Sequence, residues 1–217
     1  MFSKDYGLIS PDEGLGLEAR LLSEKKKALA IYSRDRPTVS LGRFNSASEY
    51  VDIDFAKRNG ITVIRRMSGG SAIYSDSDQL VFTVVTDRSA FRDKADSYMT
   101  ICGCLVDTLG ALGIEAMYKP MNDVLVDGRK ISGCAQYRDR DTLLHHGTLI
   151  LRLDREMMDG VLRPVKDRKY PGLTSVEESL GHVPERKEIL MAFEEGFRVG
   201  GVSSHRCSRR VRPRVCP

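Results

Sequence analysis

Two short stretches of the chain place positive charge beside a backbone that can approach a ligand closely. One runs Arg65-Arg66-Met67-Ser68-Gly69-Gly70-Ser71-Ala72-Ile73-Tyr74, and the other runs Asn122-Asp123-Val124-Leu125-Val126-Asp127-Gly128-Arg129-Lys130-Ile131-Ser132-Gly133. The glycines after Ser68 admit backbone conformations closed to other residues, so the main chain can aim N–H donors at an anion. Arg66 adds a permanently charged, forked donor, and Lys130 adds a compact, mobile charge. This chemistry suits a small ligand that carries a carboxylate and a phosphate.

Neither stretch is specific on its own. Most Ser-Gly-Gly loops are only turns, and the ends of hairpins often carry solvated lysines. A third motif, His145-His146-Gly147-Thr148-Leu149, follows the other two along the chain. Adjacent strand residues face opposite ways, so only one of its two histidines can meet a ligand.

Together the three motifs resemble the lipoate-protein ligase A family of the biotin/lipoate ligase superfamily, over roughly residues 7 to 197. The resemblance implies an α+β catalytic domain, with a mixed, largely antiparallel sheet flanked by helices as in class II synthetases. In that family the carboxylate of lipoate attacks ATP, which brings Mg²⁺, and gives lipoyl-AMP. A lysine of an apo lipoyl domain then takes the acyl group, on an E2 subunit of a 2-oxoacid dehydrogenase or on the glycine-cleavage H protein.

The resemblance also implies roles for individual residues. Lys130 resembles the catalytic lysine that contacts both the carboxylate and the phosphate of the intermediate. His146 takes the position that lines the site, so we expect His145 to pack or face outward. The residues implied for substrate and nucleotide binding are Arg66, Gly69, Gly70, Ser71, Ala72, Ile73, Tyr74, Asn122, Asp123, Lys130, Gly133, His146, Gly147 and Thr148. A separate accessory subunit is a further implied partner, because some 20 Arg-rich residues after Phe197 could not form the small second domain of the family.

Three positions depart from the family pattern. Ser71 stands where a third glycine is usual, Ser75 where a histidine is usual, and Cys134 where many ligases have serine. Two alternative functions therefore stay open. One is an octanoyl or lipoyl transferase that uses an acyl-cysteine, although the positions that align with its nucleophile are Leu143 and Glu115 here. The other is a non-catalytic protein that keeps the pocket and binds the carrier domain.

The cysteines favour neither a disulfide framework nor a zinc site. There are five, an odd number without a Cys-x-x-Cys pair, and Cys102 and Cys104 would face away from each other on a helix or a strand. We expect Cys134 to pack as a small buried hydrophobe. No metal held by the protein alone is expected, and any Mg²⁺ would arrive with the nucleotide. A reducing, cytoplasmic setting follows.

Charge divides the chain unevenly. The net charge is +4, but residues 198–217 carry six arginines and no acid, which leaves −2 on the rest. We expect one domain over residues 1–197 and an atypical or disordered tail over residues 198–217, read as a truncated or out-of-frame end rather than as a nucleic-acid arm. Nucleic acid is therefore not an expected partner. No run of about 18 apolar residues predicts a membrane span.

Hydrophobic periodicity predicts the elements that hold these motifs. Helices are expected over residues 15–30, 54–59, 95–112 and 185–197, and strands over residues 39–41, 61–65, 79–86, 123–126, 130–137 and 143–151. The order is mixed rather than a regular β-α-β series. No Gly-x-Gly-x-x-Gly and no phosphate-loop Gly-Lys-Ser/Thr occurs, which argues against a Rossmann fold and a P-loop ATPase.

Overall fold

A computed structural model describes residues 2–164 and 172–199, and its main feature is a seven-stranded mixed sheet. The strand order is β1-β2-β6-β10-β9-β8-β7, and every neighbouring pair is antiparallel except β1 with β2. The strands are β1 (Phe2–Ile9), β2 (Ala28–Arg34), β6 (Gln79–Asp87), β7 (Met117–Lys119), β8 (Asp123–Val126), β9 (Arg129–Arg138) and β10 (Thr142–Ile150). The predicted α+β class with a largely antiparallel sheet is confirmed.

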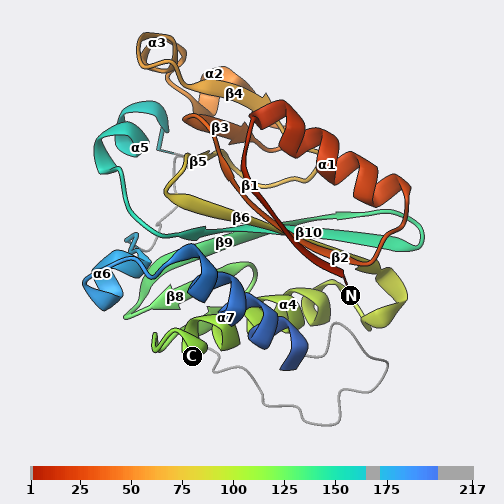
Figure 1. Cartoon of the computed structure of the whole chain (residues 1–217). Coiled ribbons are helices and arrows are strands. Elements are labelled where there is room, and N and C mark those ends of the chain that lie inside the picture. The colour runs from red at the N-terminus through yellow and green to blue at the C-terminus, as the bar shows by residue number, and fades with distance from the viewer. Residues whose placement is uncertain (1, 165–171, 200–217) are drawn as a thin grey trace.

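Helices cover both faces of this sheet (Figure 1). On one face, α4 (Lys94–Ala111) and α7 (Arg186–Val199) pack over the largest apolar cluster, where Ile189, Phe193 and Phe197 recur every four residues of α7. On the other face, α1 (Pro11–Ser23) packs through Leu17 and Leu21.

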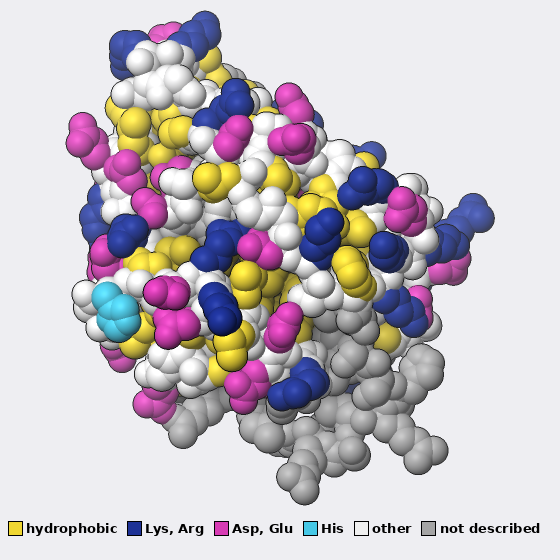
Figure 2. All heavy atoms as spheres, in the orientation of Figure 1, with side chains coloured by type: hydrophobic (Ala, Val, Ile, Leu, Met, Phe, Trp, Pro, Cys, Tyr) yellow, Lys and Arg dark blue, Asp and Glu magenta, His cyan; other side chains and the backbone are white. Residues whose placement is uncertain are grey.

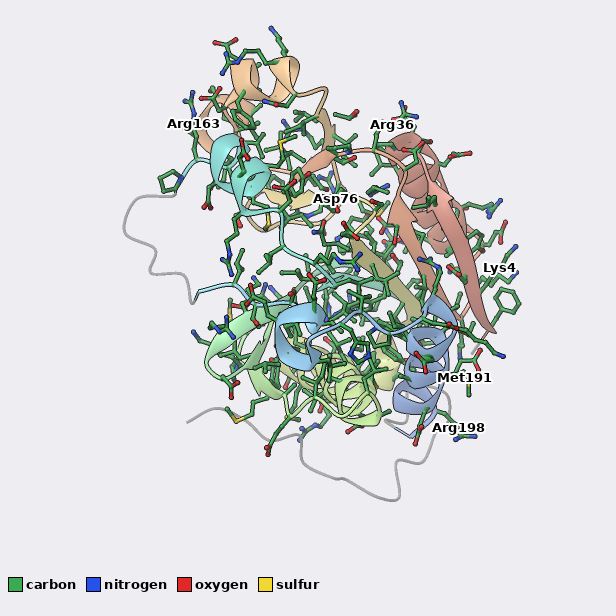
Figure 3. The ribbon with its side chains drawn as sticks, turned by 60° about the vertical axis from the view of Figure 1, so that its left-hand side comes forward. Lys4, Arg36, Asp76, Arg163, Met191 and Arg198 are labelled. Atoms are coloured by element: carbon green, nitrogen blue, oxygen red, sulfur yellow. The ribbon has the colours of Figure 1, made fainter. Side chains whose placement is uncertain are left out.

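A second, smaller sheet lies beside the long one (Figure 1). It carries the loop Ser68-Gly69-Gly70-Ser71 between two of its strands, which we call the glycine loop. It has the order β4-β3-β5, with β3 (Thr38–Leu41), β4 (Thr62–Arg65) and β5 (Ile73–Ser75). Its apolar cluster is shared with α2 (Ala47–Tyr50), α3 (Ile53–Arg58) and α5 (Arg155–Val161). Asp76 lies in the turn from β5 to β6, where the small sheet meets the long one (Figure 3). The remaining short elements are a 3₁₀ turn (Arg88–Ala90) and α6 (Val176–Leu180).

The first 35 residues differ most from the prediction. A helix over residues 15–30 is wrong: α1 begins at Pro11 and ends at Ser23, and residues 28–34 form the fully buried strand β2. Ser10 caps the helix reciprocally with Glu13, and Pro11 stands at its first turn, which are the start signals of a helix. Strand β1, at the edge of the long sheet, was also not predicted.

The elements that carry the motifs agree with the prediction to within one residue. These are α4 and the strands β4, β6, β8, β9 and β10, while α7 runs two residues further than expected. The turn between β8 and β9 has positive φ at Asp127 (49°) and Gly128 (73°), which matches the twist of the flanking strands.

Charged side chains are mixed over the visible face, where Lys and Arg lie among Asp and Glu (Figure 2). No helix in the described ranges is long and apolar enough to span a bilayer. The predicted tail lies outside the described residues from position 200 onward, so the domain boundary at 197 stays a prediction.

Candidate functional site

A cleft opens between α1, the small sheet with its glycine loop, and the β9–β10 part of the long sheet. The three predicted motifs meet there, although the residues that line the cleft from the first and last motif, Arg66 and Thr148, are 82 positions apart in the sequence. The predicted site residues that line the cleft are Arg66, Gly70, Ser71, Ile73, Asn122, Lys130, Gly133, His146, Gly147 and Thr148.

Arg66 shapes the glycine loop from beneath. Its guanidinium is buried, and Nη2 donates to the carbonyl oxygens of Gly69 (2.8 Å) and Ser71 (2.7 Å), while Nη1 donates to that of Ser40 (2.6 Å). Burial lowers the pKa of Arg66 to about 10, so it stays charged at neutral pH. Because Arg66 binds the loop carbonyls, it holds the loop in place, which adds to the anion-binding role that the motif implied.

The loop also rests against Gly42. Gly70 adopts φ +94°, and Asn45 Nδ2 donates to its carbonyl oxygen at 2.7 Å. A Cβ at Gly42 would overlap that same carbonyl group. Glycine at position 42 is therefore needed for the loop to lie where it does.

Four of the predicted site residues do not line the cleft: Gly69, Ala72, Tyr74 and Asp123. Tyr74 is buried in the apolar cluster of the small sheet, and Ala72 packs against that cluster. Side chains alternate along β5, so Ile73 and Ser75 face the cleft while Tyr74 faces away. The structure gives Tyr74 a packing role.

Lys130 and Asp123 form an ion pair in the floor of the cleft. Nζ lies 2.6 Å from Asp123 Oδ1, and both side chains are about three-quarters buried or more. A Cβ at Gly133 would come within 2.6 Å of the Lys130 side chain, so the glycine makes room for it. The Lys130 backbone is fixed as well, since its N–H donates to the Gly172 carbonyl and its carbonyl accepts from the Thr174 N–H. The ammonium is thus aimed into the cleft by a rigid strand.

A buried chain of polar groups crosses from α1 to the glycine loop. His146 Nδ1 lies 2.9 Å from Glu18 Oε1, and its Nε2 lies 2.6 Å from Ser68 Oγ. Glu18 also accepts from Tyr32 Oη and Thr83 Oγ1. Burial raises the pKa of Glu18, but the His146 charge and these hydrogen bonds outweigh it and hold the pKa below its ordinary value. His146 lines the cleft and His145 does not, so the role of His146 as the histidine that meets a ligand stays a prediction.

Sequence reasoning missed nine cleft residues, six on elements that the three motifs do not reach and three that directly follow a motif on β5 or β9. They are Leu15, Glu18, Tyr32, Arg34, Ser40, Ser75, Val81, Cys134 and Ala135. Glu18 left a signal, because a carboxylate between Leu17 and Leu21 falls on the buried stripe of a helix. Arg34 is buried too, and its Nε has no hydrogen-bond partner in the part of the chain that the structure describes. It is therefore a spare donor at the wall of the cleft.

Cys134 and His145 point to the opposite side of the sheet, under α4. Cys102 on α4 donates its S–H to Cys134 Sγ at 3.7 Å, and both thiols are buried. His145 packs between the rings of Phe82 and Tyr98. The predictions that His145 packs and that Cys134 is buried are confirmed, although the backbone of Cys134 still borders the cleft.

Residues 10–195 match the family model of the lipoyl protein ligase A/B catalytic domain. The chain belongs to this family. It is 29% identical over 202 residues to the lipoate-protein ligase LplJ of Bacillus subtilis, a match that covers 90% of the chain and 59% of the relative. It is 34% identical over 155 residues to lipoate-protein ligase A subunit 1 of Thermoplasma acidophilum, a match that covers 67% of the chain and 58% of the relative.

Transferases are also among the relatives. The octanoyltransferase LipM of Oceanobacillus iheyensis is 28% identical over 196 residues, covering 78% of the chain and 71% of the relative. The lipoyl protein ligase A/B family thus brings ligases and octanoyltransferases together among the proteins that this chain matches. The chain spans 53–60% of the length of three curated ligases that it matches, from Bacillus subtilis, Blochmanniella pennsylvanica and Staphylococcus aureus.

Solved structures agree with the fold. The bi-partite lipoate protein ligase of Thermoplasma acidophilum, studied with its E2 lipoyl domain, superimposes with a TM-score of 0.77 at 26% identity and covers 92% of this chain and 84% of that one. A lipoate-protein ligase A bound with ATP superimposes with a TM-score of 0.79 at 24% identity, and the match covers 92% of this chain and 85% of that one. This similarity supports the fold alone.

Proposed function

We propose that this chain activates lipoate with ATP as lipoyl-AMP and transfers the lipoyl group to a lysine of a lipoyl carrier domain. The observation that carries the proposal is the position of Lys130. Its ammonium lies in the cleft floor beside Gly133, facing the glycine loop that Arg66 orders. A carboxylate and a phosphate brought together in this cleft would share that cation.

The first step joins two anions. A carboxylate oxygen of lipoate attacks the α-phosphorus of ATP, the bond to the β-phosphate oxygen breaks, and pyrophosphate leaves. Positive charge fixed at the attacking oxygen and at the phosphoryl oxygens lowers the barrier, because it needs no reorganisation during the reaction. Lys130 supplies this charge, and the backbone N–H groups around Gly70 and the spare Nε of Arg34 are further donors at the cleft wall.

The second step needs no protein nucleophile. The ε-amine of the carrier lysine attacks the acyl carbonyl, the bond to the AMP oxygen breaks, and AMP leaves. Two carboxylates described at or beside the cleft are paired in this structure, Asp123 with Lys130 and Glu18 with His146. Magnesium therefore fits this cleft as an ion that ATP brings on its phosphates.

The carrier and a second protein component belong to the proposal. We expect the acceptors to be apo lipoyl domains of 2-oxoacid dehydrogenase E2 subunits or the glycine-cleavage H protein. Two findings support a second component, either a separate subunit or a further segment. The chain spans a little over half of the ligase LplJ, and a relative from Thermoplasma acidophilum is described as bi-partite.

An acyl-cysteine transferase is the second candidate, favoured by the similarity to LipM. Two features of the chain argue against this transferase. Leu143 and Glu115, which align with the transferase nucleophiles, cannot form a thioester, and the Cys134 sulfur points towards α4. A non-catalytic carrier binder is the third candidate, motivated by Ser71 and Ser75.

One incubation series separates the three functions. The purified chain is given an apo lipoyl domain with lipoate and ATP, or with an octanoyl-carrier protein without ATP, and the domain is weighed by mass spectrometry. We expect lipoylation that depends on ATP. Octanoyl transfer without ATP would establish the transferase instead, and no product from either mixture, with carrier binding retained, would establish the binder. Pyrophosphate release with and without an added accessory subunit tests the need for the second component.

A further inference from the structure

Beneath the cleft floor, two thiols and an imidazole from three elements come together. They are Cys102 on α4, Cys134 on β9 and His145 on β10, and one ligand atom of each lies within 4.8 Å of the others. Cys102 and Cys134 are 32 residues apart, so no spacing pattern in the sequence links them. The reaction proposed above does not use this group.

The proton on His145 can be placed from its neighbours. Arg138 Nη1 lies 3.2 Å from Gln136 Oε1, and an arginine can only donate, so the carbonyl oxygen of Gln136 faces Arg138. The NH₂ group of Gln136 must then face His145 Nδ1, at 3.0 Å, and donate to it.

With Nδ1 accepting, neutral His145 carries its proton on Nε2. That nitrogen is buried and has no hydrogen-bond partner among the described residues, and one ring nitrogen of His145 lies within 4.8 Å of both sulfurs. An N–H turned to sulfur stabilises a thiolate. A metal ion would need a lone pair at the same atom, so this hydrogen-bond network disfavours ligation through Nε2.

Cys134 is the sulfur that receives these donors. Cys102 donates its S–H to it, and this hydrogen bond together with the adjacent His145 holds the pKa of the Cys134 thiol well below its ordinary value, against the opposing effect of burial. The pKa of the Cys102 thiol is raised in turn. The two sulfurs lie 3.7 Å apart, which is near enough for a disulfide to form once an oxidant accepts two electrons from the pair.

Cys134 also borders the cleft. A Cβ at Gly147 would lie 2.7 Å from the Cys134 sulfur, so the glycine makes room for that sulfur next to a residue that lines the cleft. We infer that Cys134 is a redox-reactive cysteine and that Cys102 is its resolving thiol, so that peroxide-class oxidants entering by the cleft convert the pair to a reversible disulfide.

The chemistry balances with peroxide as the oxidant. The Cys134 thiolate attacks one peroxide oxygen, the O–O bond breaks, and Cys134 sulfenic acid and hydroxide form. The Cys102 sulfur then attacks the Cys134 sulfur, its proton goes to the departing oxygen, and water leaves. The two cysteines lose two electrons and peroxide gains them.

The experiment uses the full chain with Cys207→Ser and Cys216→Ser, which leaves three cysteines. After reductant is removed, hydrogen peroxide is titrated and non-reduced peptides are mapped by mass spectrometry. We expect a Cys102–Cys134 cross-linked peptide as the first product, reversed by dithiothreitol. Adding Cys104→Ser, a buried thiol of the same helix, should leave that product unchanged, and Cys102→Ala should give Cys134 sulfenic acid that dimedone traps.

A pH profile tests the role of His145 as a positioning residue. His145→Phe keeps a ring between Phe82 and Tyr98 but removes the donor, and circular dichroism checks its fold. Iodoacetamide should modify Cys134 of the folded parent chain about tenfold or more faster than Cys104 at pH 7, and His145→Phe should move that reaction to higher pH. Equal rates at the two cysteines, or no Cys102–Cys134 peptide, would overturn the inference. So would zinc that copurifies at one equivalent and must be chelated before the thiols react.

Discussion

The Lys130 ammonium lies 2.6 Å from the carboxylate of Asp123, so the cation that we place at the reacting oxygens is held by an anion of the neighbouring strand. Asp123 Oδ1 has no hydrogen-bond partner besides this ion pair within the described residues. The pair positions Lys130 at the floor of the cleft, where its ammonium can be shared with an anionic substrate.

Lys130→Ala should abolish adenylate formation and leave the fold intact. Its Nζ lies at the cleft floor rather than in the core, whereas loss of a charged contact in a desolvated site costs roughly 3 kcal/mol of transition-state stabilisation, or about 100-fold in rate. ATP–pyrophosphate exchange measures the step. Arg129→Ala is the matched control, because this neighbouring cation pairs with Glu178 away from the cleft. Near wild-type exchange by Lys130→Ala would remove Lys130 from the mechanism.

The site features that could be predicted from the sequence are those whose residues lie close together along the chain. The strand, the Asp127-Gly128 turn, Lys130 and Gly133 lie within a dozen residues, so motif and turn chemistry predicted both their structure and their place in the cleft. The pairing of Glu18 with His146 spans 128 residues and depends on how α1 packs on the sheet, which no local pattern specifies.

Tyr74 shows a second limit. The motif placed it with the ligand-binding loop, and its local strand is real, but alternation along β5 turns its ring into the core of the small sheet. Likewise the predicted helix ends inside β2, over residues 28–30, because the seven residues of β2 are all buried and so lack the alternation that distinguishes a strand.

Stability should fall in acid through Glu18. Its pKa is below the ordinary 4.5 in the folded chain, so the unfolded chain binds the proton more readily. The carboxylate therefore stabilises the fold fully above pH 4.5, and this contribution is lost as the pH falls through the lowered folded pKa. Urea unfolding at a series of pH values, compared between the parent chain and Glu18→Gln, isolates the contribution. The two curves should converge in acid, and a constant difference between them would refute this.

Gly42→Ala should displace the glycine loop. The added methyl group would overlap the Gly70 carbonyl, which is backbone and cannot swing aside. We expect a loss of roughly 1–3 kcal/mol in stability and weaker ATP binding by calorimetry. Gly16→Ala is the control, since its methyl group meets nothing within 4 Å on the exposed side of α1 and alanine favours a helix. If Gly42→Ala binds ATP as the parent does, the loop geometry is not needed for the nucleotide.

Cys134→Ser should retain ligation. The family resemblance implies a serine at this position in many ligases. The Cys134 sulfur packs against Cys102 under α4, so its side chain does not point into the cleft. A turnover within a few fold of the parent is expected from lipoate, ATP and an apo lipoyl domain. Mass spectrometry of the acid-quenched parent chain should find no acyl adduct on Cys134, since both proposed steps pass through AMP rather than a thioester. Loss of all turnover in Cys134→Ser together with an acyl-cysteine in the parent would replace the ligase with the transferase.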